Sequence, residues 1–109
     1  MAARTILITG CSSGIGLASA RVMSARGWHV IATARKETDL AMLRADLKVD
    51  AVHLELADPN SLAACADRAL SLSGGRIDAL FNNAAYGQAG AVEDLSVDLL
   101  RRQFEVNLF

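Results

Sequence analysis

The 109-residue sequence has few of the features that mark secreted, metal-binding or membrane proteins. Only two cysteines occur, Cys11 and Cys65. They are too few for a disulfide framework, and neither has the spacing of a metal-ligand set. No apolar run approaches the roughly 18 residues of a membrane span, and the apolar stretch near the N-terminus is too short for a signal peptide. These absences favour a cytoplasmic protein with no membrane span and no bound metal.

An excess of charge is also missing, because the formal net charge is −1. Basic residues cluster only as the pairs Arg35-Lys36 and Arg101-Arg102, which argues against a nucleic-acid or anionic-membrane surface. Hydrophobic residues make up 52% of the chain, so a packed core is expected and disorder is not. The length allows one domain at most, and no internal repeat or low-complexity linker divides it.

What is present is an alternation of short apolar segments with helical patterns. The apolar segments predict strands at 5–9, 29–33, 51–56 and 77–81, and the intervening patterns predict helices. Gly27 and Gly74-Gly75 are placed to end two of these helices, whereas Asp58-Pro59 is placed to begin one. Such alternation is typical of an α/β fold with a parallel sheet. We expect the first half of a Rossmann-type, doubly wound sheet with strand order 3-2-1-4.

Residues 9–16, TGCSSGIG, follow the first predicted strand. Ile15, Ala18, Val22 and Ala25 then recur at helical spacing, so Gly10, Gly14 and Gly16 lie at a strand-to-helix junction. Glycines there allow a sharp turn and a close approach of backbone, and the helix N-terminus favours a phosphate. The hydroxyls of Ser12 and Ser13 would add donors. The simpler alternative is an ordinary tight connection of an α/β protein.

The spacing of this loop differs from two better-known phosphate loops. A GxGxxG fingerprint would require glycine where Ser12 stands, and a P-loop would require a lysine after the last glycine. Cys11 lies within the loop, where a helix N-terminus could lower the pKa of its thiol. The simpler interpretation is that Cys11 is a small residue filling a slot that alanine could fill.

The end of the second predicted strand bears on cofactor choice. NAD-binding sheets carry an acidic residue there for the adenosine ribose, but this chain has Ala34 and Arg35, followed by Lys36. A guanidinium can bind a 2′-phosphate through two charge-assisted hydrogen bonds. The pattern therefore favours NADP over NAD and disfavours a methyltransferase-like fold. The alternative is a solvated basic pair at a strand end.

Asparagines mark two later segments. Residues 81–87, FNNAAYG, place Asn82 and Asn83 at the end of the fourth predicted strand, beside the glycine loop across the switch point of the sheet. Residues 104–109, FEVNLF, place Asn107 in the apolar stripe of a last predicted helix, which Ser96 would cap. A turn for the first pair and a local hydrogen bond for Asn107 are the plainer interpretations.

Taken together, TGCSSGIG, ATARK, LELAD, FNNAA and FEVNLF resemble, in order and spacing, the short-chain dehydrogenase/reductase family along the whole chain. The resemblance implies that residues 10–16 hold the cofactor pyrophosphate and that Arg35 holds the 2′-phosphate of NADP. It also places Glu55 and Leu56 beside the adenine, and Asn82 and Ala84 beside the ribose and nicotinamide. Glu55 stands where the family has an aspartate, and Ala85 where the family has a glycine. The family's catalytic asparagine corresponds to Asn107.

The rest of that family's catalytic set has no match in this sequence. The family uses a serine and a Tyr-x-x-x-Lys motif, but the one tyrosine here, Tyr86, is followed four residues later by Gly90. Residues 1–109 are therefore interpreted as an incomplete NAD(P)-binding domain, the N-terminal portion of an oxidoreductase acting on a carbonyl or secondary alcohol. We expect this chain to be inactive alone and to associate, and the complete protein to be a homo-oligomer. The alternative is a non-catalytic dinucleotide-binding or sensing module.

Overall fold

A computed structural model of the chain describes residues 3–83. It contains four parallel strands: β1 (Thr5–Ile8), β2 (His29–Ala34), β3 (Asp50–His53) and β4 (Ala79–Phe81). The helices are α1 (Gly14–Ala25), α2 (Glu37–Met42), which continues into the π-helical turn η1 (Leu43–Leu47), and α3 (Pro59–Ser73). The strand order is β3-β2-β1-β4. The predicted α/β class and the order 3-2-1-4 are confirmed.

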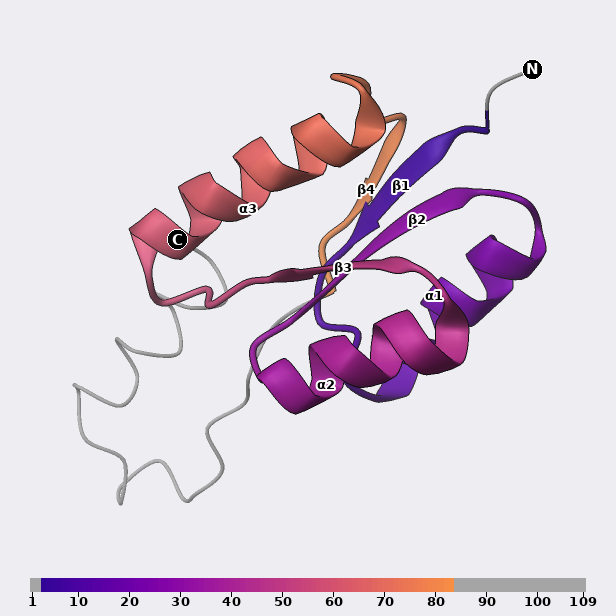
Figure 1. Ribbon diagram of the computed structural model, residues 1–109, viewed down its shortest axis with the longest axis horizontal. Helices are drawn as coiled ribbons and strands as arrows, with labels where there is room; N and C mark the ends of the chain where they lie inside the picture. Colours follow the sequence, from indigo (N-terminus) through magenta and orange to yellow (C-terminus); the bar gives the residue numbers. More distant parts are fainter. Residues whose placement is uncertain (1–2, 84–109) are drawn as a thin grey trace, which may run out of the picture.

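Helices cover both faces of the sheet, so the described part has three layers (Figure 1). On one face lie α1 and α2, and the core there is built around Ile8 of β1, Ala20 of α1 and Leu40 of α2. The opposite face is covered by α3, whose Cys65 and Ala69 contact Ile31 and Val52 of the sheet. A sheet buried on both faces explains why its central strands read as continuous apolar runs.

The ends of several elements differ from the prediction. Asp58 caps α3 as expected, with its carboxylate accepting a hydrogen bond from the backbone N–H of Asn60 at 3.0 Å. The third strand, however, ends at His53 and not at residue 56. The chain leaves the sheet early because the N–H of Glu55 turns to the hydroxyl of the buried Ser61, 2.8 Å away. Glu55 and Leu56 therefore lie in the connection to α3.

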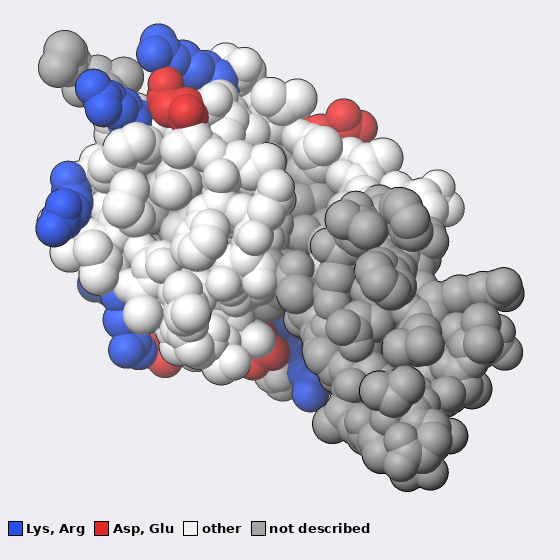
Figure 2. Space-filling view, turned by 180° about the vertical axis from the view of Figure 1, so that it is seen from behind, with Lys and Arg blue, Asp and Glu red and all other residues white. Residues whose placement is uncertain are grey.

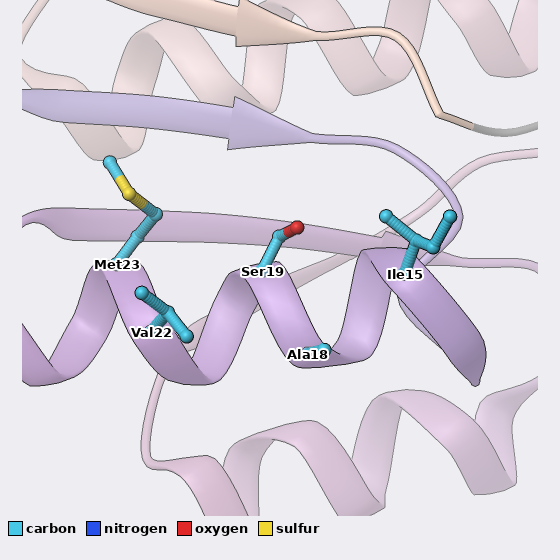
Figure 3. Close-up of a pocket in the computed structure, with 5 residues that line it drawn as sticks. All are labelled: Ile15, Ala18, Ser19, Val22 and Met23. Atoms are coloured by element: carbon cyan, nitrogen blue, oxygen red, sulfur yellow. The ribbon is translucent and has the colours of Figure 1, made fainter.

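The apolar stripe that predicts α1 is not the face that contacts the sheet. Ile15 and Val22 are 69% and 51% exposed, whereas the buried residues of α1 are Gly16 and Ala20. Small residues bring the helix backbone close to the strands. The outer stripe forms a shallow groove of about 300 Å³ with Ala18, Ser19 and Met23 (Figure 3). In helix α3, likewise, Leu62 and Leu70 are exposed, while Ser61, Cys65 and Ala69 are buried.

Charge is distributed unevenly over the described surface. Seen from behind the view of Figure 1, a broad central area carries neither basic nor acidic side chains, which lie at its rim (Figure 2). Within residues 3–83 no helix is both long and apolar enough to cross a membrane. The same residues contain no group of three His, Cys, Asp or Glu side chains that could hold a metal ion.

Candidate functional site: a glycine loop and a basic strand end

The connection from β1 to α1 turns at glycines. Gly10 and Gly14 have φ angles of +72° and +61°, in the region that residues with a Cβ rarely adopt. Gly10 directs the chain away from the end of β1, and Gly14 starts α1. The predicted strand–loop–helix junction is therefore present, with the helix N-terminus beside the carboxyl ends of the strands.

Gly16 is required for a different reason, which is close approach. A Cβ on this residue would overlap the carbonyl oxygen of Gly10 and would lie 2.7 Å from the amide nitrogen of Asn83. Asn83 follows β4 and donates from that same amide to the Gly10 carbonyl at 3.2 Å. The first turn of α1 thus lies against the start of the loop, and the Asn83 side chain bridges the loop to β4.

Thr33, near the end of β2, supports the loop from the other side. Its hydroxyl accepts a hydrogen bond from the N–H of Gly10 at 3.2 Å, and its carbonyl accepts one from the N–H of Cys11 at 2.8 Å. Thr33 is only 1% exposed. The sequence interpretation missed Thr33, and it placed Asn83 beside the loop without giving it a role. A polar residue inside a strongly apolar strand was the available signal for Thr33, because buried polar groups usually have a specific partner.

The loop therefore divides into a supporting part and an exposed part. Gly10, Cys11 and Gly16 build the turn, while residues 12–15 are exposed. Ser13 occupies the N-cap but makes no capping bond through its side chain. As a result, the N–H groups of Gly14 and Ile15 have no partner among residues 3–83. Unpaired donors at the positive end of a helix dipole form a favourable environment for an anion.

Cys11 is a structural residue rather than a reactive one. Its thiol is fully buried and donates to the carbonyl of Ile8 at 3.3 Å. Burial raises the pKa of the Cys11 thiol, and a backbone hydrogen bond with Thr33 offsets only part of that effect. The idea that the helix N-terminus lowers this pKa is therefore wrong, because desolvation of the thiolate dominates.

The end of β2 places Arg35 next to Glu55. The two strands stay paired up to this point, since the N–H of Leu54 donates to the carbonyl of Ala34 at 3.0 Å. Arg35 Nε then lies 3.8 Å from Glu55 Oε2, and the two side chains are 64% and 31% exposed. Two residues predicted to contact different parts of a cofactor thus form an ion pair with each other.

The other residues predicted to bind the cofactor or act in catalysis either make few contacts in the structure or lie outside its described part. Asn82 is exposed at the end of β4, beside the better-anchored Asn83. Leu56 is half-buried and packs against the core under α3. Ala84, Tyr86 and Asn107, together with the predicted helix that Ser96 would cap, lie outside the residues that the structure describes.

Sequence comparison gives one family for this chain. The family model described as short chain dehydrogenase matches residues 4–109. Similar curated proteins include the uncharacterized oxidoreductase YbbO of Escherichia coli K12, 36% identical over 97% of this chain, and a short-chain dehydrogenase of Penicillium crustosum, 39% identical over 100% of it. The chain covers 39% and 41% of those two proteins, respectively.

Solved structures agree with the sequence matches. A short-chain dehydrogenase from Streptomyces avermitilis superposes with a TM-score of 0.90 at 37% identity, over 100% of this chain and 40% of that one. An actinorhodin polyketide ketoreductase variant crystallised with NADPH gives a TM-score of 0.89 at 29% identity, over 97% and 42%. The glycine loop, the strand order and these matches lead to one assignment: the chain belongs to the short-chain dehydrogenase family of oxidoreductases.

Proposed function

We propose that residues 1–109 form the NADP-binding region of an oxidoreductase that transfers hydride between NADP(H) and a carbonyl or secondary alcohol. The observation that carries this proposal is the exposed part of the glycine loop. Its unpaired N–H groups at Gly14 and Ile15 suit the pyrophosphate of a dinucleotide. Asn83 and Thr33 hold the loop in place, so little ordering would remain to occur on binding.

The preference for NADP follows from the end of β2. An acidic side chain at that point would repel a 2′-phosphate, but Ala34 is buried and Arg35 extends into solvent. The terminal nitrogens of Arg35 have no partner among residues 3–83, so two donors remain available for a phosphate. Crystal structures of two similar proteins contain NADPH, which is consistent with this choice.

Arg35→Asp tests the cofactor preference. Loss of a bidentate, charge-assisted contact should weaken NADPH binding by about 1.5–3 kcal/mol relative to NADH. Affinities measured by nucleotide fluorescence for both cofactors give the ratio. Lys36→Asp, a charge reversal of equal size one residue away, is the matched control and should change the ratio less. If Arg35→Asp leaves the ratio unchanged, the assignment of Arg35 to the 2′-phosphate is wrong.

We also propose that this chain binds the cofactor without catalysing the reaction by itself. Hydride transfer needs a proton donor to the forming alkoxide, and loss of a general acid costs roughly 10²–10⁴-fold in rate. The phenol of Tyr86 has no lysine four residues later. NADPH oxidation with a panel of aldehydes and ketones, run beside Tyr86→Phe, tests this point. Turnover above the buffer rate that disappears in Tyr86→Phe would contradict the proposal.

Association is the third part of the proposal. Among residues 3–83, β4 pairs only with β1, and Leu80 of β4 is 56% exposed. An open strand edge with exposed apolar side chains is a template for pairing with another chain. We expect the isolated chain to associate at micromolar concentration and the complete protein to be a homo-oligomer. Light scattering that shows a folded, stable monomer of the chain would contradict the first expectation.

A further inference from the structure

The ion pair between Arg35 and Glu55 bears on how strongly this protein can prefer a 2′-phosphorylated cofactor. Glu55 is the better-anchored partner. Its N–H donates to Ser61 Oγ at 2.8 Å, and its Oε1 accepts from the N–H of Ala57 at 3.4 Å. The Arg35 side chain has no hydrogen bond and no other ion pair among residues 3–83. The backbone of Glu55 is therefore held in place, and its carboxylate has one long hydrogen bond, whereas the guanidinium of Arg35 has only the carboxylate as a partner.

The geometry of the pair indicates that Glu55 competes with a 2′-phosphate for Arg35 and does not orient Arg35 to bind one. At 3.8 Å, Nε and Oε2 are too far apart for a hydrogen bond. Glu55 therefore does not fix the plane of the guanidinium in the way that a bidentate partner would. Its negative charge nevertheless attracts Arg35 and so opposes transfer of the guanidinium to a phosphate. An incoming 2′-phosphate must replace the carboxylate as the partner of Arg35.

We propose that Glu55 is an internal competitor for Arg35, and that it determines cofactor specificity by lowering the preference for 2′-phosphorylated nucleotides. This inference rests on the proposed NADP-binding function, in which Arg35 receives the phosphate. It gives Glu55 a different role from the adenine contact that the family resemblance implies. An aspartate at this position would reach one methylene less far towards Arg35.

The test compares two probes that differ only in the phosphate of interest, 2′,5′-ADP and 5′-ADP. Binding of each to the 109-residue chain is measured by calorimetry. In Glu55→Gln the amide oxygen can still accept from Ala57, so the local fold should persist, and circular dichroism checks it. We expect 2′,5′-ADP to bind roughly two- to fivefold more tightly to this variant, as the strength of an exposed ion pair allows. Binding of 5′-ADP should be unchanged.

The matched control is Glu37→Gln. Glu37 is an exposed carboxylate two residues after Arg35, but it pairs with Arg44 at 3.6 Å. This variant removes the same charge nearby without touching the Arg35 pair, so it should leave the preference between the two probes unchanged. An equal gain in Glu37→Gln would mean that net charge alone is responsible and would overturn the proposal.

A double-mutant cycle separates the routes by which Glu55 could act. If Glu55 acts through Arg35, the effect of Glu55→Gln should disappear in an Arg35→Ala background. An effect that persists in full would mean direct repulsion of the phosphate. Equal weakening of both probes in Glu55→Gln would mean an adenine contact, and weaker binding of 2′,5′-ADP alone would mean that Glu55 supports Arg35. Each of these results overturns the proposal.

The same measurements distinguish failure of the proposed NADP-binding function from failure of the proposed role of Glu55. If Arg35→Ala leaves the preference for 2′,5′-ADP over 5′-ADP unchanged, Arg35 does not bind the phosphate, and the NADP assignment fails together with this inference. If Arg35→Ala abolishes the preference but Glu55→Gln does not increase it, only the competitor role of Glu55 fails. If neither probe binds to the chain, dinucleotide binding itself is wrong.

Discussion

The two ends of the parallel sheet are held together by different kinds of contact. At the amino end, side chains link all four strands in a row. Asp50 of β3 contacts His29 of β2 at 2.6 Å, His29 contacts the hydroxyl of Thr5 on β1 at 3.3 Å, and the N–H of Thr5 donates to Asp78, just before β4, at 2.8 Å. Arg76 completes the row, 2.8 Å from Asp78.

At the carboxyl end, most of the contacts involve backbone groups. The N–H groups of Gly10 and Cys11 bond to Thr33, the carbonyl of Gly10 accepts from Asn83, and the N–H of Asn83 donates to Thr9 Oγ1 at 3.0 Å. Charged side chains are therefore paired at the amino end, whereas at the other end the N–H groups of Gly14 and Ile15 have no partner among residues 3–83. We propose that the amino end serves stability and that the carboxyl end binds the nucleotide.

Gly16→Ala should give the largest effect at the carboxyl end. The added methyl group would overlap the Gly10 carbonyl, a backbone atom that cannot move without breaking the loop. We expect a loss of about 3 kcal/mol of folding stability, at the upper end of overpacking costs, and loss of nucleotide binding. Gly14→Ala is the control, because its Cβ would meet open space. Strain at positive φ should cost it only about 1–2 kcal/mol. Urea unfolding measures both, and equal losses would contradict the role of close approach.

Thr33→Val should produce the next largest effect. It leaves the partly buried N–H of Gly10 without its side-chain acceptor, which should cost about 1–3 kcal/mol. Nucleotide affinity should fall as well, because the loop loses its support from β2. Thr33→Ser restores the hydroxyl and should recover most of the affinity. A serine variant that binds as weakly as the valine variant would show that the methyl group of Thr33, not its hydroxyl, is what matters.

Asp78→Asn tests the amino end through its dependence on pH. The backbone N–H of Thr5, and then Arg76, hold the pKa of the Asp78 carboxyl below its ordinary value of 3.8. A depressed pKa means that the carboxylate stabilises the fold above the unfolded-state pKa and that this contribution is lost as the pH falls through the folded-state pKa. Wild-type chain should therefore lose stability below about pH 4 more steeply than Asp78→Asn.

Urea unfolding between pH 7 and pH 3 measures the two slopes. Asp46→Asn, which removes an exposed carboxylate that has no hydrogen bond or ion pair among residues 3–83, is the control and should follow the wild type. Nucleotide binding at pH 7 should be the same in all three proteins. Reduced binding in Asp78→Asn would show that the two ends of the sheet are not independent.

Asp50→Asn should have the smallest effect. Both partners of the His29–Asp50 pair are partly exposed, and such pairs contribute about 0.2–1 kcal/mol. We expect a loss within that range and no change in nucleotide affinity. Raising the salt concentration should reduce the difference from the wild type, because exposed charges are screened. A loss well above 1 kcal/mol would mean that the row across the strands acts as one cooperative network.

The sequence predicts the fold better than it predicts the site. Strand order follows from the alternation of patterns, because few topologies satisfy it. The helix positions follow from apolar spacing, but Ile15 and Val22 show that an apolar stripe need not mark the face on the sheet. In α1 the buried residues are Gly16 and Ala20, whose small size allows the contact, and the partly buried Leu17 and Met23 pack against the same core. The sequence interpretation used the other apolar stripe of this helix.

The site contacts that the sequence did not predict all span long distances along the chain. Gly10 forms hydrogen bonds with Thr33 and Asn83, which lie 23 and 73 residues away in the sequence. Glu55 meets Arg35 because β3 ends three residues earlier than the apolar run suggests, after which Ser61 turns the chain. Strand order places Asn83 beside the loop, but the individual contacts depend on where two neighbouring strands end, which local sequence patterns do not show.

The two buried thiols can report local opening of the fold, each through the rate at which a thiol reagent labels it. Cys11 belongs to the core on the α1 side of the sheet and Cys65 to the core under α3, and both are buried. A thiol reagent can reach either sulfur only when its own layer opens, so the labelling rate of each cysteine reports the opening free energy of one layer. Saturating nucleotide should slow the labelling of Cys11, which sits in the loop, more than that of Cys65 on the far side. The time course of one reagent would thus measure whether ligand tightens one layer or both.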